Sequence, residues 1–164
     1  QLDMLRTIKT KIDELDELVL DHAYACQKCR ILMSIPGVGP MTAANFVLAV
    51  YEADRFEKSK SVGAYFGLTP RRRQSGEMDY NGRISKRGDR VIRHQLYEAA
   101  NSILTRVKKP SSLQAWGLRI AKRSGMKKAR IAVARKLAVI MHQMLQTGEL
   151  FCFNPATGEK ATYA

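Results

Sequence analysis

The sequence predicts an all-α fold: a helical bundle with a long N-terminal helix and a small loop or β-hairpin insertion around residues 68–87. Apolar residues recur at helical spacing along most of the 164 residues, and glycine and proline interrupt them at few places. Hydrophobic residues make up 45% of the chain, which is enough for a core. We expect an N-terminal helical region over 1–33, a main domain over 34–150 and a loose tail over 151–164.

The first segment repeats apolar residues in alternating steps of three and four: Leu5, Ile8, Ile12, Leu15 and Val19. Such a seam is typical of a helix that packs on another helix. The partner helix lies either in this chain or in a second copy. A second helix is expected over about 23–33.

Residues 34–40 read Ser-Ile-Pro-Gly-Val-Gly-Pro, which breaks any helix. The closing proline suits the first position of the next helix, predicted over 41–53. Helix, turn and helix form a unit of the helix-hairpin-helix type. The bare backbone at Gly37, Val38 and Gly39 could then approach a DNA phosphate. The motif alone fits a tight corner equally well, and the net charge favours DNA contact.

A short helix is expected over 59–66, with Gly67 in a left-handed conformation at its end. The following stretch, 68–87, is polar and rich in turn residues. Within it, Asn81-Gly82 is a pair typical of hairpin turns and predicts a small hairpin formed by the three residues on either side.

Three longer helices complete the domain. Asp89 can cap the first of them, which has apolar residues at helical spacing: Ile92, Leu96, Ala99, Ala100, Ile103 and Val107. Helices over 112–124 and 127–146 follow, separated by Gly125. The last helix is expected to face the core with Val133, Leu137, Ile140, Met141 and Met144.

The charge is strongly one-sided. Lys and Arg number 28 against 15 Asp and Glu, a net charge of +13. No acid stands between Glu98 and Glu149, whereas this stretch holds eleven bases. An ordinary solvated helix mixes both signs to gain favourable pairs. The missing acids therefore favour a polyanionic partner, most simply a nucleic acid.

Basic residues concentrate where the chain is polar. Arg71, Arg72 and Arg73 precede Gln74-Ser75-Gly76, and five more follow: Arg83, Lys86, Arg87, Arg90 and Arg93. Arginine binds phosphate bidentately and stabilises charge on a phosphoryl group under attack. Ser75 is therefore the candidate nucleophile. Spacing alone favours a simpler interpretation, with Ser-Gly as a turn and the arginines as backbone contacts, because no general base is evident.

Other chemistries are not expected from the residues. Cys26 and Cys29 have CxxC spacing, but the only other cysteine is Cys152, so we expect no zinc site. This cysteine usage fits a reducing cytosol. The carboxylates form no cluster suited to Mg²⁺, and His142 is expected to be packed rather than catalytic. We expect neither a membrane helix nor a secretory signal.

The motifs also occur in a characteristic order. Ile-Pro-Gly-Val-Gly-Pro at 35–40 is followed by Arg55-Phe56, by Gly-Ala-Tyr-Phe-Gly-Leu-Thr-Pro at 63–70, by Gln-Ser-Gly at 74–76, by Gly-Arg-Ile-Ser-Lys-Arg-Gly-Asp at 82–89 and by Arg93. This ordered set resembles the C-terminal transposase domain of the insertion-sequence 110/1111 family, from about residue 31 to 107 and more loosely to 150.

The resemblance implies a bacterial mobile-element protein that catalyses DNA transposition, a DNA recombination reaction, directed by a guide RNA. In this family the serine that maps onto Ser75 attacks the DNA backbone, and Ser85 is our reserve candidate. The resemblance also implies an N-terminal RuvC-like acidic domain that binds Mg²⁺, a dimer or tetramer, and a cytoplasmic, nucleoid-associated protein. Since the chain begins at Gln1, we expect a fragment without that domain, inactive alone and binding no cofactor. The alternative is a non-catalytic helix-hairpin-helix module that binds DNA or RNA.

Overall fold

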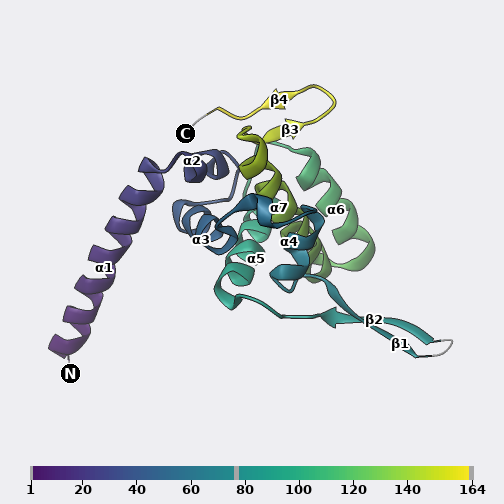
Figure 1. Ribbon diagram of the computed structural model, residues 1–164, viewed down its shortest axis with the longest axis horizontal. Coiled ribbons are helices and arrows are strands. Elements are labelled where there is room, and N and C mark those ends of the chain that lie inside the picture. The colour runs from purple at the N-terminus through teal and green to yellow at the C-terminus, as the bar shows by residue number, and fades with distance from the viewer. Residues whose placement is uncertain (1, 76–77, 163–164) are drawn as a thin grey trace.

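The computed structural model describes residues 2–75 and 78–162 and is a helical bundle with small antiparallel hairpins, which confirms the predicted all-α class (Figure 1). The helices are α1 (Leu2–Ala25), α2 (Gln27–Met33), α3 (Pro40–Val50), α4 (Lys60–Tyr65), α5 (Arg90–Thr105), α6 (Ser112–Ser124) and α7 (Met126–Thr147), with a 3₁₀ turn, η1, at Ala53–Arg55. The strands are β1 (Pro70–Ser75), β2 (Met78–Ile84), β3 (Cys152–Asn154) and β4 (Glu159–Lys160). Over this part of the chain, none of the helices has both the length and the apolar character of a membrane span.

Helix α7 is the centre of the bundle, and α2, α4, α5 and α6 all contact it. Its core face carries Val133, Leu137 and Met141, each fully buried. Burial of one such side chain contributes about 1.5–3 kcal/mol. The predicted core face of this helix is therefore confirmed, except that Ile140 is only partly buried.

Helix ends follow local capping chemistry. The Asp89 carboxylate accepts a hydrogen bond from the Ile92 N–H at 3.0 Å and begins α5, as predicted. Ser111 does the same for α6, accepting from Gln114 N at 3.1 Å. By contrast, α3 ends at Val50, three residues before the predicted end, where Tyr51 takes a φ of 58°.

His142 is a buried structural residue, as expected. Its Nε2 lies 2.8 Å from the carbonyl oxygen of Ala53, and its Nδ1 lies 3.0 Å from Ser59 Oγ. Since a carbonyl can only accept, Nε2 carries the hydrogen, and in the neutral ring Nδ1 accepts from the serine. The imidazole thus fastens η1 and the start of α4 to α7.

Helix α1 extends away from the bundle (Figure 1). The predicted helix is present, but its seam is open: Leu5, Ile8, Ile12 and Leu15 are all at least half exposed. Packing begins only near its C-terminal end, where Ala23 is fully buried. Among the residues that the structure describes, no second helix covers this seam, so pairing with another copy stays a prediction.

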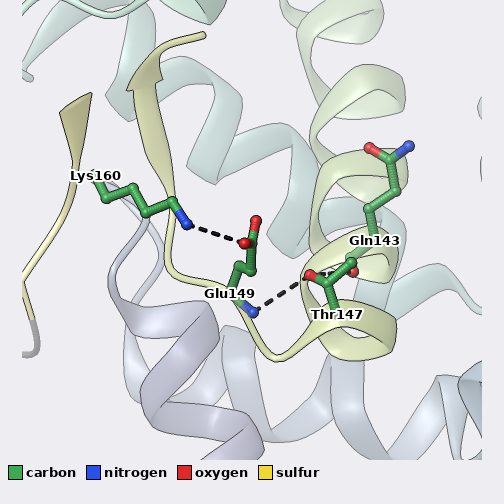
Figure 2. A network of polar contacts seen from close by, with 4 residues as sticks. All are labelled: Gln143, Thr147, Glu149 and Lys160. Carbon is green, nitrogen blue, oxygen red and sulfur yellow. Dashed lines mark hydrogen bonds and ion pairs between the residues drawn. The ribbon is translucent and has the colours of Figure 1, made fainter. Parts of the chain in front are cut away.

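The C-terminal segment, expected as a loose tail, instead folds back as the hairpin of β3 and β4. Phe151 and Phe153 are buried, and the Phe151 N–H donates to Ser34 Oγ at 3.0 Å. Figure 2 shows the polar contacts beside it: Lys160 pairs with Glu149 at 2.9 Å, and the Glu149 N–H donates to Thr147 Oγ1. Two aromatic side chains two residues apart, burying apolar surface, hold this segment to the bundle.

Strands β1 and β2 form a hairpin that projects from the bundle, here called the arm (Figure 1). The predicted hairpin register was wrong. Asn81 and Gly82 lie within β2, and Ser75 pairs with Met78 at the far end of the arm. This register pairs the whole of β1 and satisfies more backbone groups than a hairpin closed at Asn81-Gly82. A bulge between Pro70 and Arg72 absorbs one extra residue of β2.

The root of the arm, residues 67–70 and 84–88, is a close backbone crossing. Gly67 has a φ of 68° and Gly88 a φ of 78°. A Cβ on Gly67 would overlap the Arg87 backbone, and a Cβ on Gly88 would overlap the Tyr65 carbonyl oxygen. The end of α4 and the chain entering α5 therefore touch backbone to backbone, which only glycine permits at these two positions.

We predict that Gly88→Ala destabilises the chain by more than the φ penalty of about 1–2 kcal/mol for a non-glycine residue. Gly148→Ala is the matched control, because Gly148 has a φ of 71° but its Cβ would meet nothing within 4 Å. Urea denaturation of both variants measures the difference. Equal losses of unfolding free energy would show that the crossing at the arm root adds nothing to stability.

Candidate nucleic-acid interface

The arm and its root carry most of the predicted basic site. Arg71 is exposed, and its guanidinium donates to the Ser85 carbonyl oxygen at 3.0 Å across the hairpin. Four further predicted residues are exposed around the root and the start of α5: Arg83, Lys86, Arg87 and Arg90. Arg71 and Arg83 therefore lie on the arm, Lys86 and Arg87 lie at its root, and Arg90 begins α5.

Ser75 is the last residue of β1, so its backbone lies at the end of the arm distal to the bundle. The side chains of Ser75, Arg72 and Arg73 lie outside the described part of the structure. The backbone nevertheless fixes where Ser75 lies along the arm. The end of β1 lies at the far point of the arm, away from the apolar core.

Arg93 contacts the protein backbone at the arm root. Its Nη1 lies within hydrogen-bonding distance of four carbonyl oxygens at the arm root: Phe66 (3.3 Å), Arg87 (3.1 Å), Gly88 (3.4 Å) and Asp89 (3.3 Å). Nη1 carries two N–H donors and stays charged, so these carbonyl oxygens share its donors. Arg93 therefore holds the backbone crossing together, and its predicted phosphate contact stays a prediction.

The three residues of the turn between α2 and α3 that were predicted to contact a phosphate have different surroundings. Val38 is buried, and its N–H donates to the Ile35 carbonyl oxygen at 3.0 Å, so it has no free N–H for a phosphate. Gly37 has a φ of 90° and approaches Ser102 of α5 closely. Gly39 is exposed, and a Cβ there would meet nothing within 4 Å.

Gly39 is also where the exposed backbone begins a helix. It is the N-cap of α3, and no side chain within the described residues caps this helix. By helix geometry, the N–H groups of Met41 and Thr42 have no partner inside the helix and point out of its start, at the positive end of its dipole. Gly39 has a φ of −90°, which other residues adopt easily, and a side chain there would meet no protein atom. Neither backbone conformation nor packing therefore requires glycine at this position, whereas close approach of a ligand would.

Two cations on α7 were missed among the candidate residues. Lys128 and Arg135 are exposed and line a cavity shared with the arm root. The signal that could have found them was the acid-free stretch from Glu98 to Glu149, which the sequence interpretation noted without choosing residues from it. Only the packing of α7 beside the arm distinguishes these two from the other nine bases of that stretch.

The CxxC pair lies at the junction of α1 and α2. Partial burial would raise the pKa of the Cys26 thiol, but hydrogen bonds from the backbone and thiol of Cys29 outweigh it, and the pKa falls below its ordinary value. Burial raises the pKa of Cys29 to about 12. Within the ranges 2–75 and 78–162, no three His, Cys, Asp or Glu residues gather as a metal site.

We predict that Cys26 is alkylated well before Cys29 near neutral pH, because only thiolates react and Cys29 stays protonated and buried. Iodoacetamide labelling followed by peptide mass spectrometry measures both rates. The same reaction in urea is the control, in which the two rates should converge. Faster labelling of Cys29 in the folded chain would contradict the assignment.

We predict that Gly39→Ala leaves the melting temperature nearly unchanged and weakens duplex DNA binding roughly tenfold, the value of one charge-assisted hydrogen bond. The added methyl group meets no protein atom but blocks close approach of a phosphate. Fluorescence anisotropy measures the affinity. Gly37→Ala should instead lower stability, because its φ of 90° is unfavourable for alanine. Unchanged affinity for Gly39→Ala would favour the simple-corner interpretation.

Comparison with known proteins shows which family the chain resembles. The model of the transposase IS116/IS110/IS902 family matches residues 29–116. The chain is 32% identical to the transposase for insertion sequence element IS1111A of Coxiella burnetii, over 90% of this chain and 43% of that protein. It is 26% identical to a probable family 20 transposase of Pseudomonas aeruginosa, over 93% of this chain and 45% of that protein.

A third relative is a pilin gene-inverting protein of Moraxella bovis, 26% identical over 76% of this chain and 38% of that protein. The chain thus spans less than half the length of these relatives. The family match covers more than half of the chain, from α2 through the arm and α5 into α6. On this evidence the chain belongs to the IS116/IS110/IS902 family of transposases.

Proposed function

We propose that this chain is the DNA-binding and strand-transfer part of a transposase, with Ser75 as its nucleophile. The observation that carries the proposal is the arm: a projecting hairpin with cations along its root and a serine at the far end of β1. Family membership supports DNA as the polymer that the arm meets. The name of the pilin gene-inverting relative also describes a DNA rearrangement.

The proposed chemistry is a transesterification. The Ser75 hydroxyl oxygen attacks a backbone phosphorus, a serine–phosphate bond forms, and one phosphorus–oxygen bond to deoxyribose breaks. The serine proton passes to a base, and the departing sugar oxygen takes up a proton. A DNA hydroxyl then attacks the same phosphorus and releases the serine, so the number of phosphodiester bonds is conserved. Nearby arginines stabilise the extra charge on the phosphoryl oxygens.

The chain's own described residues do not fit a Mg²⁺ site, since no three potential ligands gather among them. Any such ion would be bound by carboxylates of a separate acidic domain. In this proposal the present chain contributes the nucleophile, the arginines and the phosphate-binding backbone at the start of α3. A guide RNA and assembly into a dimer or tetramer belong to the same proposal for the complete protein.

We predict that Ser75→Ala in a complete transposase carrying this chain lowers transposition on the order of 10⁴-fold or more, because removal of a nucleophile is rarely compensated. Ser85→Ala is the matched control. Its backbone belongs to the arm root, where its N–H donates to the Thr69 carbonyl oxygen, and it should retain activity. Parental transposition by the Ser75 variant, or loss only in the Ser85 variant, would sink the assignment.

The second candidate is a binding module without chemistry of its own. The observation that favours it is that the exposed backbone at Gly39 and the exposed cations at the arm root can both bind phosphates without any catalytic group. Trapping on a nicked DNA substrate separates the two. A covalent serine–DNA adduct that survives denaturation supports catalysis, whereas complexes that dissociate fully in salt support binding alone.

A further inference from the structure

A groove lies between the root of the arm and α7, here called the root groove. It has a volume of about 660 Å³. Its deeper lining is apolar: Leu68 is buried, and Ile84, Ile131 and Ala132 are partly buried. Its outer lining is cationic and exposed: Arg83 and Lys86 from the arm and its root, and Lys128 and Arg135 from α7.

The α7 side of the groove is positioned by packing. A Cβ on Gly63 of α4 would come within 2.9 Å of Arg135 Cγ, so the bare Gly63 backbone accepts the aliphatic stem of Arg135. A stem fixed in this way loses less freedom when its guanidinium binds an anion. Among the residues that the structure describes, neither Lys128 nor Arg135 forms an ion pair. Both charges are therefore available to a ligand.

The combination of an apolar base and a cationic rim selects among ligands. A DNA duplex turns its bases inward and offers phosphates and sugars, which would leave the apolar lining uncovered. An unpaired nucleotide offers both parts at once, a phosphate for the cations and a flat apolar base face for the lining. The groove is continuous with the arm, on which the proposed function places a DNA strand.

We propose that the root groove binds an unpaired nucleotide of a DNA strand, with its phosphate at Lys128 and Arg135 and its base against Ile84 and Ile131. This inference rests on the proposed function for the identity of the polymer. It adds a strand-specific site on α7, remote in sequence from the arm. Such a site would hold a strand that has left its duplex beside the arm that acts on it.

The test compares the 164-residue chain with Lys128→Gln/Arg135→Gln and with the control Lys122→Gln/Arg123→Gln. Both double variants lose two positive charges and keep long side chains, and Lys122 and Arg123 are exposed at the end of α6. Anisotropy with a labelled oligothymidine should show roughly tenfold weaker binding for the groove variant only. Its log–log salt slope should become less steep by about 0.7, for one phosphate of a single strand.

A second measurement needs no variant. The unmodified chain should bind an oligothymidine several-fold more tightly than an abasic strand of the same length, because the phosphates are equal and only the bases differ. Equal affinity for the two strands would overturn the proposal, as would equal losses in the two double variants. A loss confined to an RNA strand would also overturn it. Duplex binding and the Ser75 adduct are independent of these outcomes and test the proposed function separately.

Discussion

The close crossing of two backbones at the arm root is the constraint on which the functional part of the structure depends. The end of α4 and the chain entering α5 meet at Gly67 and Gly88, with no side chain between them. The guanidinium of Arg93 binds the carbonyl oxygens of both segments. A two-stranded hairpin alone has marginal stability in water. This anchor fixes the place where the arm projects from the bundle, and it therefore also fixes the start of β1, the strand that ends at Ser75.

The same arrangement explains how one basic segment serves two purposes. Arg93 faces carbonyl oxygens and stabilises the root, whereas Arg83, Lys86 and Arg87 are exposed around it. The positive charge of the root thus has two sources. Arg93 contacts backbone carbonyl oxygens, whereas the other cations are exposed to solvent. At the start of α3 the donors are backbone N–H groups rather than side chains, because no side chain of the described residues caps this helix at Gly39. Side-chain and backbone donors together suit a phosphate backbone and carry no sequence information directly.

Helix α7 joins the core to this surface. One side of it is buried in the core and carries Val133 and Leu137, and another side presents Lys128 and Arg135 to the root groove. A helix held by a full core face keeps its outer cations at fixed positions, so that binding orders fewer side chains. The stability of the bundle and the proposed nucleic-acid surface therefore share one element.

The sequence by itself determined the all-α class, the limits of α6, the Asp89 cap and the core face of α7, because helical spacing and capping act over a few residues. It also determined the basic character of the arm and, through an ordered motif set, the family. Only the tertiary structure decided the arm register, the burial of Phe151 and Phe153, the structural contacts of Arg93 and the place of Lys128 and Arg135. The burial of Phe151 and Phe153 and the place of Lys128 and Arg135 depend on segments distant in sequence. The arm register and the Arg93 contacts depend on which of several nearby backbone partners the folded chain selects. Local sequence patterns do not show which groups will surround a side chain in the fold. An arginine that binds a phosphate and one that binds a backbone carbonyl oxygen look the same in the sequence.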